Sequence, residues 1–227
     1  MLRVSCIMFI MFKAVIFDMD GVLIDSEIHW YEAEMNFLKA YDIKLTKEHA
    51  ARMTGRSLHE SVTILKEEFA LPHSVEELLG EKTRHSEEIY MYKAQEMPGV
   101  TELLQKITSA GLQAAIASGS SLPRIKMIVD RFGWQDYFGH LVSTDHVNLI
   151  GKPDPAIYVY TAGVLQIDPA ECLVIEDSVN GVRAAKRAGM SCAAVLDERW
   201  CWGDYSEADL VVETLTNPKL AEFIGIN

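Results

Sequence analysis

Apolar and polar positions follow two different rhythms along this chain. From residue 98 onward, short apolar runs alternate with segments that have the 3.6-residue period of a helix. Glycines stand where three of these helical segments end, at residues 111, 133 and 189. The expected strands lie at residues 14–17, 112–118, 139–144, 171–177, 191–196 and 208–212. The expected helices between them lie at residues 100–111, 121–133, 154–165 and 178–189, with a short last helix around Leu220.

This alternation of strands and helices predicts an α/β fold, namely a Rossmann-like parallel sheet flanked by helices on both faces. Connections between parallel strands are right-handed crossovers, and ligands of such sheets bind at the carboxyl ends of the strands.

The segment between residues 27 and 96 has a different pattern, because helical periodicity continues without a clear strand. The expected helices lie at residues 28–41, 47–54, 57–70 and 74–95. We therefore expect a helical domain at 27–96, inserted into a core domain that is formed by residues 13–26 and 97–227. Two short hinges are expected near residues 25–28 and 96–99, which would allow the insertion to act as a mobile lid.

Composition narrows the range of functions. The 227 residues are 49% hydrophobic and 24% charged, as in ordinary globular proteins, and the formal net charge is -12. Such an acidic surface argues against nucleic-acid binding, which depends on basic charge. The four cysteines, at positions 6, 172, 192 and 201, form no CxxC pair, so they are interpreted as buried or incidental thiols of a cytoplasmic protein.

The amino terminus carries an apolar run at residues 4–12 after Arg3. The run is shorter than the ~20 residues of a membrane span, and no small-residue cleavage site follows it. Residues 1–12 are therefore expected to be a poorly ordered extension rather than a membrane anchor or signal peptide. Met11 is a plausible alternative start.

The residues with the most chemistry fall where the expected strands end. Three strands end in or lead directly into a pair of such residues, namely Asp18 and Asp20, Ser118 and Gly119, and Glu176 and Asp177. Lys152 lies in the sequence GKPDP just before a helix. If the strands are parallel, these groups meet at one edge of the sheet. Four crowded carboxylates need compensating positive charge, which Lys152 and an oxygen-bound Mg²⁺ would supply.

Such a site suits phosphoryl transfer. One carboxylate attacks phosphorus, a second protonates the leaving oxygen and then deprotonates water, and the cations neutralise the phosphoryl oxygens. Each motif alone has an ordinary explanation. A DxD pair is common in surface loops, and Asp177 or Ser178 could simply cap a helix. Gly21 is misplaced for an EF-hand, and no GxxxxGK[ST] P-loop is present. Only the joint order of the motifs is specific.

That order resembles the haloacid dehalogenase-like hydrolase superfamily, in its phosphatase and β-phosphoglucomutase-like branch. FDMDGVLIDSE, ASGS, GKPDP and IEDSVNG are similar to its four motifs, and the resemblance runs from about Lys13 to the end of the chain. The insertion at 27–96 is similar to the helical cap that this branch carries after its first motif. Asp25, the third acid of the first motif, is expected to mark the hinge.

The resemblance implies a role for each motif residue. Asp18 would be the nucleophile and a Mg²⁺ ligand, and Asp20 would be the general acid and base, with its backbone carbonyl on the metal. Ser118 and Gly119 would bind phosphate, and Lys152 would stabilise charge. Metal ligation would fall to Asp177 directly and to Glu176 directly or through water.

The cap is expected to choose the substrate. Arg56, in MTGRSLHES, is a candidate for a second anion contact, with a solvated arginine as the alternative. His29 is a candidate substrate contact, with a plain helix surface as the alternative. Two departures weaken a mutase interpretation: His29 lies one residue nearer the nucleophile than the mutase histidine, and Leu58 falls where the mutases carry a cap arginine. The aromatic residues of IYMY, at 89–92, are expected to pack within a helix.

The sequence thus predicts a Mg²⁺-dependent phosphatase of a small phosphorylated metabolite, with sugar phosphates among the candidates, acting through an aspartyl-phosphate. A β-phosphoglucomutase-like phosphomutase is the first alternative, and a non-catalytic regulator that binds a phospho-ligand is the second. No nucleic-acid or membrane partner is expected, and the choice between monomer and homodimer is open.

Overall fold

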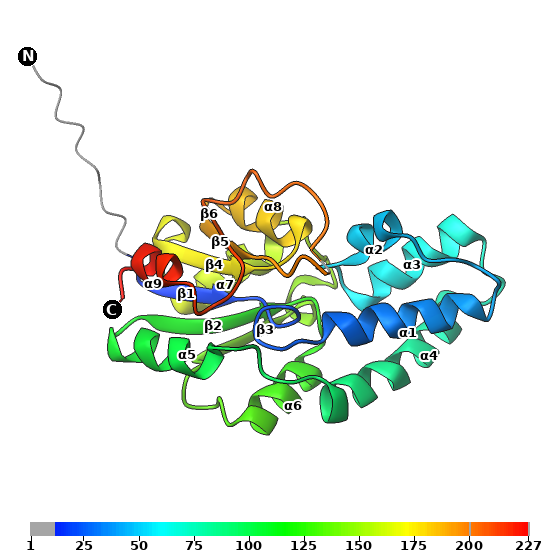
Figure 1. Cartoon of the computed structure of the whole chain (residues 1–227), viewed down its shortest axis with the longest axis horizontal. Helices are drawn as coiled ribbons and strands as arrows, with labels where there is room; N and C mark the ends of the chain where they lie inside the picture. Colours follow the sequence, from blue (N-terminus) through cyan, green and yellow to red (C-terminus); the bar gives the residue numbers. More distant parts are fainter. Residues whose placement is uncertain (1–11, 200, 227) are drawn as a thin grey trace, which may run out of the picture.

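The computed structural model describes residues 12–199 and 201–226 of the chain. Its centre is a parallel sheet of six strands in the order β3-β2-β1-β4-β5-β6 (Figure 1). The strands are β1 (Ala14–Phe17), β2 (Gln113–Ser118), β3 (His140–Ser143), β4 (Cys172–Glu176), β5 (Ser191–Val195) and β6 (Leu210–Val212). The predicted fold class, a Rossmann-like parallel sheet flanked by helices, is confirmed.

Both faces of the sheet are buried, because successive residues of each strand point to opposite sides. Val15 and Phe17 belong to one hydrophobic cluster, with α5 (Val100–Ser109), α6 (Leu122–Phe132) and α9 (Pro218–Ile224). Ala14 and Ile16 belong to a second cluster, with α7 (Ala156–Leu165) and α8 (Val179–Arg187). The continuous apolar run of β1 is explained by this double coverage.

Two short 3₁₀ turns were not expected from the pattern: η2 (Thr144–Val147) follows β3, and η3 (Pro169–Glu171) precedes β4. Each is capped by the side chain of the preceding residue. Ser143 accepts a hydrogen bond from the backbone N–H of Asp145, and Asp168 accepts one from that of Ala170.

The helices of the insertion lie beyond the carboxyl ends of the strands (Figure 1). They are α1 (Glu27–Lys39), α2 (Lys47–Met53), α3 (Leu58–Phe69) and α4 (Val75–Glu88), and they surround a third hydrophobic cluster that includes Phe37 and Leu65. The last expected helix, residues 74–95, ends in a π-helical turn, η1 (Ile89–Lys93), so that Ile89 and Tyr90 are both buried in succession.

The two segments that link the insertion to the core are paired. Ile24 and Glu96 form an isolated antiparallel bridge, and Met97 N donates to Leu23 O at 2.9 Å. Asp25 lies at this crossing, where its carboxylate accepts a hydrogen bond from Gln95 N at 2.5 Å. The domain boundaries at 26/27 and 96/97 stay a prediction.

The amino-terminal boundary differs from expectation by one residue. Phe12, which we had assigned to the extension, is 6% exposed, and its ring centroid lies 5.7 Å from that of Phe223 on α9. Phe12 is therefore part of the hydrophobic core. The remainder of the expected extension, with Cys6 and the alternative start at Met11, lies outside the described residues.

Cys172 and Cys192 are buried, and Cys201 is half-buried; all three are free thiols, as expected. Among the helices of the described residues, none combines the length and apolar character that crossing a membrane requires.

Candidate active site

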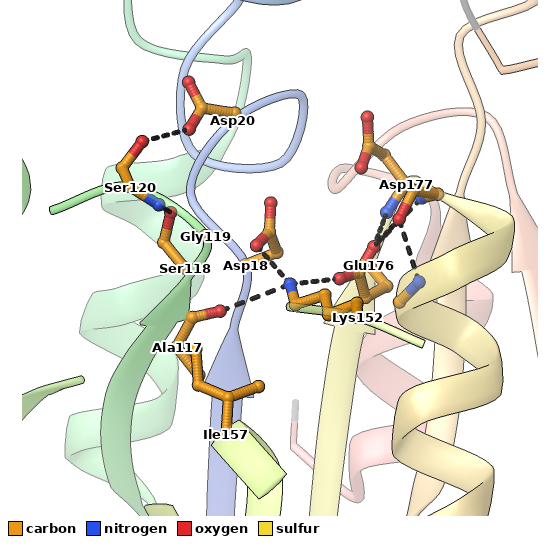
Figure 2. A network of polar contacts seen from close by, with 12 residues as sticks. Asp18, Asp20, Ala117, Ser118, Gly119, Ser120, Lys152, Ile157, Glu176 and Asp177 are labelled. Atoms are coloured by element: carbon orange, nitrogen blue, oxygen red, sulfur yellow. Dashed lines mark hydrogen bonds and ion pairs between the residues drawn. The ribbon is translucent and has the colours of Figure 1, made fainter. Parts of the chain in front are cut away.

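The central strand β1 delivers the first two acids to the carboxyl edge of the sheet. Asp18 follows β1 directly, and its backbone N–H donates to Ile175 O of β4 at 3.0 Å. Because β1 lies between β2 and β4, Asp18 sits between Ala117 and Glu176 in Figure 2. This position is the point where the strand order reverses, at which doubly wound sheets bind ligands.

Lys152 joins the acids of β1 and β4. Its Nζ lies 2.5 Å from Asp18 Oδ1 and 2.5 Å from Glu176 Oε1, and the side chain is 1% exposed. Burial alone would lower the pKa of Lys152, but the two carboxylates raise it above its ordinary value, so the ammonium stays charged. Burial raises the pKa of Asp18 to about 8, against the attraction of Lys152.

Glu176 is saturated with hydrogen bonds. Lys152 and Tyr158 Oη donate to Oε1, while the N–H groups of Asp177 and Ser178 and the Ser178 hydroxyl donate to Oε2. Burial would raise the pKa of Glu176, yet Lys152 and these hydrogen bonds hold it below its ordinary value. Both oxygens of Glu176 already accept hydrogen bonds. Glu176 is therefore better placed to anchor Lys152, and to reach a metal through water, than to bind the metal directly.

The acidic cluster has the donor set of a site for a hard divalent cation. Asp18, Glu176 and Asp177 each offer a carboxylate oxygen, and these oxygens lie within 4.8 Å of one another. Burial, together with the negative charge of Glu27, raises the pKa of Asp177 well above its ordinary value. Gly21 leaves the space beside Asp177 open, since a Cβ there would lie 2.0 Å from Asp177 Oδ2. These residues fit Mg²⁺, with Asp18 and Asp177 as the more available ligands.

Asp20 is held by four side chains, two from the start of α1 and one each from η1 and the loop after β2. Oδ1 accepts hydrogen bonds from Ser26 Oγ at 2.5 Å and from Trp30 Nε1 at 3.3 Å. Ser120 Oγ donates to Oδ2 at 3.2 Å. Tyr90 Oη lies 2.9 Å from Oδ1 and 3.0 Å from Oδ2. Figure 2 shows the carboxylate turned towards Ser120, on the far side of Asp18 from Asp177.

The end of β2 and the loop after it carry Ser118 and Gly119, the residues that are expected to bind phosphate. Ser118 is 1% exposed, and its Oγ accepts a hydrogen bond from Ser120 N at 3.1 Å. A Cβ on Gly119 would lie 2.7 Å from Arg56 O, so only glycine permits the cap to approach this loop so closely. The polypeptide of the cap thus covers the loop directly.

A cavity separates the strand ends from the cap. Asp18, Asp20, Ser118, Gly119 and Asp177 line its floor, together with Ser120. Its cap side includes Arg56, which the sequence proposed as a substrate contact; Arg56 Nε donates to Arg52 O at 2.8 Å. Leu58 also lines the cavity.

His29 is placed differently from Arg56. Among the described residues the cavity lining includes Trp30 rather than His29, and His29 Nδ1 lies 3.9 Å from Glu32 Oε2. Its role as a substrate contact stays a prediction.

Sequence reasoning missed three features of the cavity. Glu27 lines the cavity, and burial together with the charge of Asp20 raises the pKa of Glu27 to about 8. Its position at the end of the motif FDMDGVLIDSE could have indicated that it lies near the site. Glu34 and Lys82, from α1 and α4, form a buried ion pair in its wall. Tyr90 was expected only to pack, although its burial within η1 is confirmed.

Comparison with known proteins agrees with this geometry. The family described as haloacid dehalogenase-like hydrolase matches residues 12–189. The chain is 32% identical over 218 residues to a bifunctional riboflavin kinase/FMN phosphatase of Arabidopsis thaliana, covering 93% of this chain and 55% of that protein. The chain thus spans about half the length of that relative.

Two further similarities cover more than three quarters of both chains. A phosphorylated carbohydrates phosphatase of Thermotoga maritima is 33% identical over 178 residues, which are 78% of this chain and 82% of that protein. The solved structure of a putative β-phosphoglucomutase from Bacteroides vulgatus is 29% identical, with a TM-score of 0.76, covering 95% of this chain and 90% of that one. The curated relatives agree with the predicted class of enzyme, a phosphoric monoester hydrolase. The chain therefore belongs to the haloacid dehalogenase-like hydrolases.

Proposed function

We propose that this protein is a Mg²⁺-dependent phosphatase that hydrolyses a small phosphorylated metabolite through an aspartyl-phosphate on Asp18. The observation that carries the proposal is the buried arrangement of Asp18, Lys152 and Asp177 at the floor of a cavity that the cap covers. A carboxylate held against a permanent cation is oriented for attack, and Lys152 together with a bound Mg²⁺ would offset the negative charge of the acids and admit an anionic substrate.

In the proposed reaction, a carboxylate oxygen of Asp18 attacks phosphorus and the bond to the leaving oxygen breaks. Asp20 gives its proton to that oxygen, which departs as an alcohol. Asp20 then takes a proton from water, whose oxygen attacks the phosphorus of the aspartyl-phosphate. Inorganic phosphate leaves and Asp18 is restored.

The other floor residues bind and orient. Ser118 Oγ and the adjacent backbone N–H groups hold phosphoryl oxygens, and Lys152 neutralises their charge. Mg²⁺ bound by Asp18, Asp177 and the backbone carbonyl of Asp20, with Glu176 acting through water, would supply further positive charge to the transferred group.

The residues of the cavity wall on the cap side favour a small polar substrate that also has an apolar surface. The cavity is lined by the Glu34–Lys82 pair and by aromatic residues that include Trp30 and Tyr31. Charged groups of this kind bind hydroxyls, and aromatic faces cover apolar ring surfaces. The substrates in the names of the Thermotoga and Arabidopsis relatives, phosphorylated carbohydrates and FMN, are of this kind.

The test is phosphate release from a panel of sugar phosphates, nucleotides and pyrophosphate, measured with Mg²⁺ and with EDTA. We expect Mg²⁺-dependent release from at least one ester, silence in EDTA and full recovery when Mg²⁺ is restored. Asp18→Asn, which keeps the size of the side chain, should abolish turnover while leaving the circular dichroism spectrum unchanged. Activity in chelator would refute the metal, and near-normal activity of the variant would remove Asp18 as nucleophile.

A phosphomutase is the second candidate, since the Bacteroides vulgatus structure carries the name of a putative β-phosphoglucomutase. Leu58 in the cavity wall disfavours it, because this apolar side chain stands in the place of the mutase arginine. Incubation with β-glucose 1-phosphate and a bisphosphate primer separates the two. Glucose 6-phosphate formed without free phosphate would establish the mutase, whereas free phosphate supports the phosphatase.

A further inference from the structure

Tyr90 occupies an unusual position for a cap residue. It lies in the π-helical turn η1, is 0% exposed, and its hydroxyl reaches the active-site floor. Turns of this kind are rare and often mark functional sites. Met91 and Tyr92, which follow in the same turn, are 44% and 70% exposed. The turn therefore directs Tyr90 inward and leaves the two residues that follow it exposed to solvent.

The hydroxyl of Tyr90 differs from the other donors to Asp20 in how many carboxylate oxygens it reaches. Within the described part of the chain, Tyr90 supplies the one side-chain donor within hydrogen-bond distance of both carboxylate oxygens, at 2.9 and 3.0 Å. Ser120 Oγ lies 2.7 Å from Tyr90 Oη and 3.2 Å from Asp20 Oδ2. Each hydroxyl has one hydrogen. The pair can therefore keep Asp20 hydrogen-bonded through either hydroxyl.

Tyr90 is itself fixed from two sides. Its ring lies edge-on against Trp30, with centroids 5.8 Å apart, and its backbone carbonyl accepts a hydrogen bond from Arg131 Nη1 of α6 at 2.6 Å. Trp30 belongs to the cap and Arg131 to the core. Tyr90 thus links the two through its ring and its backbone, and its hydroxyl ends on the carboxylate of Asp20.

We propose that Tyr90, with Ser120, is a positioning residue that orients the Asp20 carboxylate for proton transfer to the leaving oxygen. The inference rests on the proposed function. A general acid acts only when its carboxyl oxygen lies within hydrogen-bond reach of the leaving group. Without the phenol, Asp20 keeps Ser26 and Trp30 as partners of Oδ1 and Ser120 as a partner of Oδ2, but it loses the donor that lies within reach of both oxygens.

Two esters of similar shape test this role. Phenyl phosphate releases a phenoxide as basic as a tyrosine side chain, with a pKa of about 10, and so needs protonation. The nitrophenolate of 4-nitrophenyl phosphate is a far weaker base and leaves without a proton. The quantity measured is kcat/KM. It reports the steps from substrate binding to departure of the alcohol, and hydrolysis of the aspartyl-phosphate does not contribute to it.

Tyr90→Phe should lower kcat/KM for phenyl phosphate at least about tenfold, a part of the 10²–10⁴-fold that a positioned acid contributes. The loss for 4-nitrophenyl phosphate should be far smaller. Ser120→Ala should show the same selectivity. Tyr92→Phe is the matched control on the same turn and should affect neither ester. In an Asp20→Asn background, Tyr90→Phe should cause no further loss, because both changes remove one function.

Equal losses for both esters, an additional loss in the Asp20→Asn background, or no loss would each overturn the inference. Absence of turnover by the wild-type protein on every phosphate ester would instead contradict the proposed function. A crystal structure of Tyr90→Phe gives an answer that needs no turnover. A second orientation of Asp20 supports the inference, and an unchanged carboxylate contradicts it.

Discussion

Lys152 is a cation enclosed between two carboxylates, and its energetic role extends beyond the reaction. Asp18 and Glu176 each lie 2.5 Å from its Nζ, and all three residues are buried. Removing the cation from such a cluster leaves like charges facing one another in a medium that solvates them poorly. Lys152 should therefore contribute both to the free energy of unfolding and to the rate of phosphate release.

Replacing Lys152 with methionine should expose this double role. Breaking a buried ion pair costs about 3–5 kcal/mol, so the free energy of unfolding of the Lys152→Met protein, measured by urea titration in EDTA, should fall by that order. Phosphate release should fall at least about 10²-fold.

The matched control is Lys186→Met, which breaks a half-exposed pair with Asp209 of 2.6 Å. Exposed pairs contribute at most about 1 kcal/mol. Equal effects of the two variants on unfolding would show that Lys152 does not hold the buried carboxylates together.

At the scale of elements, the turn between α2 and α3 is the part of the cap that meets the core. Asn180 Nδ2 of α8 donates to Thr54 O at 2.9 Å, and Ser57 Oγ donates to Leu149 O at 3.3 Å. Gly55 sits between these contacts with φ +80°, and a Cβ there would lie 2.6 Å from Ser178 Oγ. The turn thus closes against the residues that follow β4.

Gly55→Ala should hold the cap away from the floor. A displacement of about 1 Å can cost on the order of 10²-fold in rate, so we expect kcat/KM to fall at least about tenfold on the best ester of the panel. Gly80→Ala is the control, because Gly80 is an exposed position of α4 with no heavy atom within 4 Å of an added Cβ. It should leave the kinetics unchanged and raise the free energy of unfolding by about 0.5–1 kcal/mol. Identical kinetics for both variants would exclude this contact as part of the closed state.

The elements were largely predictable from the sequence, since burial imposes periods that can be counted. The expected first strand, residues 14–17, coincides with β1, and the cap helices differ from expectation mainly at their ends. The 3₁₀ turns and the π-helical turn were not predictable, because one or two local hydrogen bonds decide them and leave little trace in hydrophobic periodicity.

The site was predictable only for residues that lie in the strand-end motifs. Asp18 and Lys152 are 134 positions apart, yet the strand order implied their meeting. Tyr90 and Ser120 lie 70 and 100 positions from Asp20, and the Glu34–Lys82 pair spans 48 positions. An aromatic residue in a helix signals burial without naming its partner, and a charged residue in a helix has the pattern of a solvated face. Three-dimensional contacts were needed to separate these cases.

For the whole molecule, the crowded acids link stability to pH and to metal. Burial raises the pKa of Asp18 and of Glu27 to about 8, above the values near 4 of an unfolded chain. Between those values the folded, metal-free protein binds more protons than the unfolded chain, so its stability should fall as pH rises from about 4 to 8. Mg²⁺ binds the deprotonated ligands and should offset this loss.

Thermal unfolding at pH 5.5 and pH 8, each with EDTA and with Mg²⁺, measures the effect. We expect a lower Tm at pH 8 than at pH 5.5 in EDTA, and a larger upward shift by Mg²⁺ at pH 8. The ionic strength is kept constant in all four samples, so that a difference in Tm cannot come from general screening of charges by salt. An equal Mg²⁺ shift at both pH values would be incompatible with proton-linked binding at this cluster.

The paired hinge segments have a consequence for how this enzyme can change. Leu23 bonds with Met97, and Ile24 bridges Glu96, so the chain leaves the core and returns to it at a single point. Everything between is one continuous stretch of sequence whose ends already meet. Exchanging that stretch for another that begins and ends at this bridge should leave the strands that carry Asp18, Lys152 and Asp177 in register. The replacement would also have to bring its own partners for Asp20, because Trp30 and Tyr90 leave with the stretch.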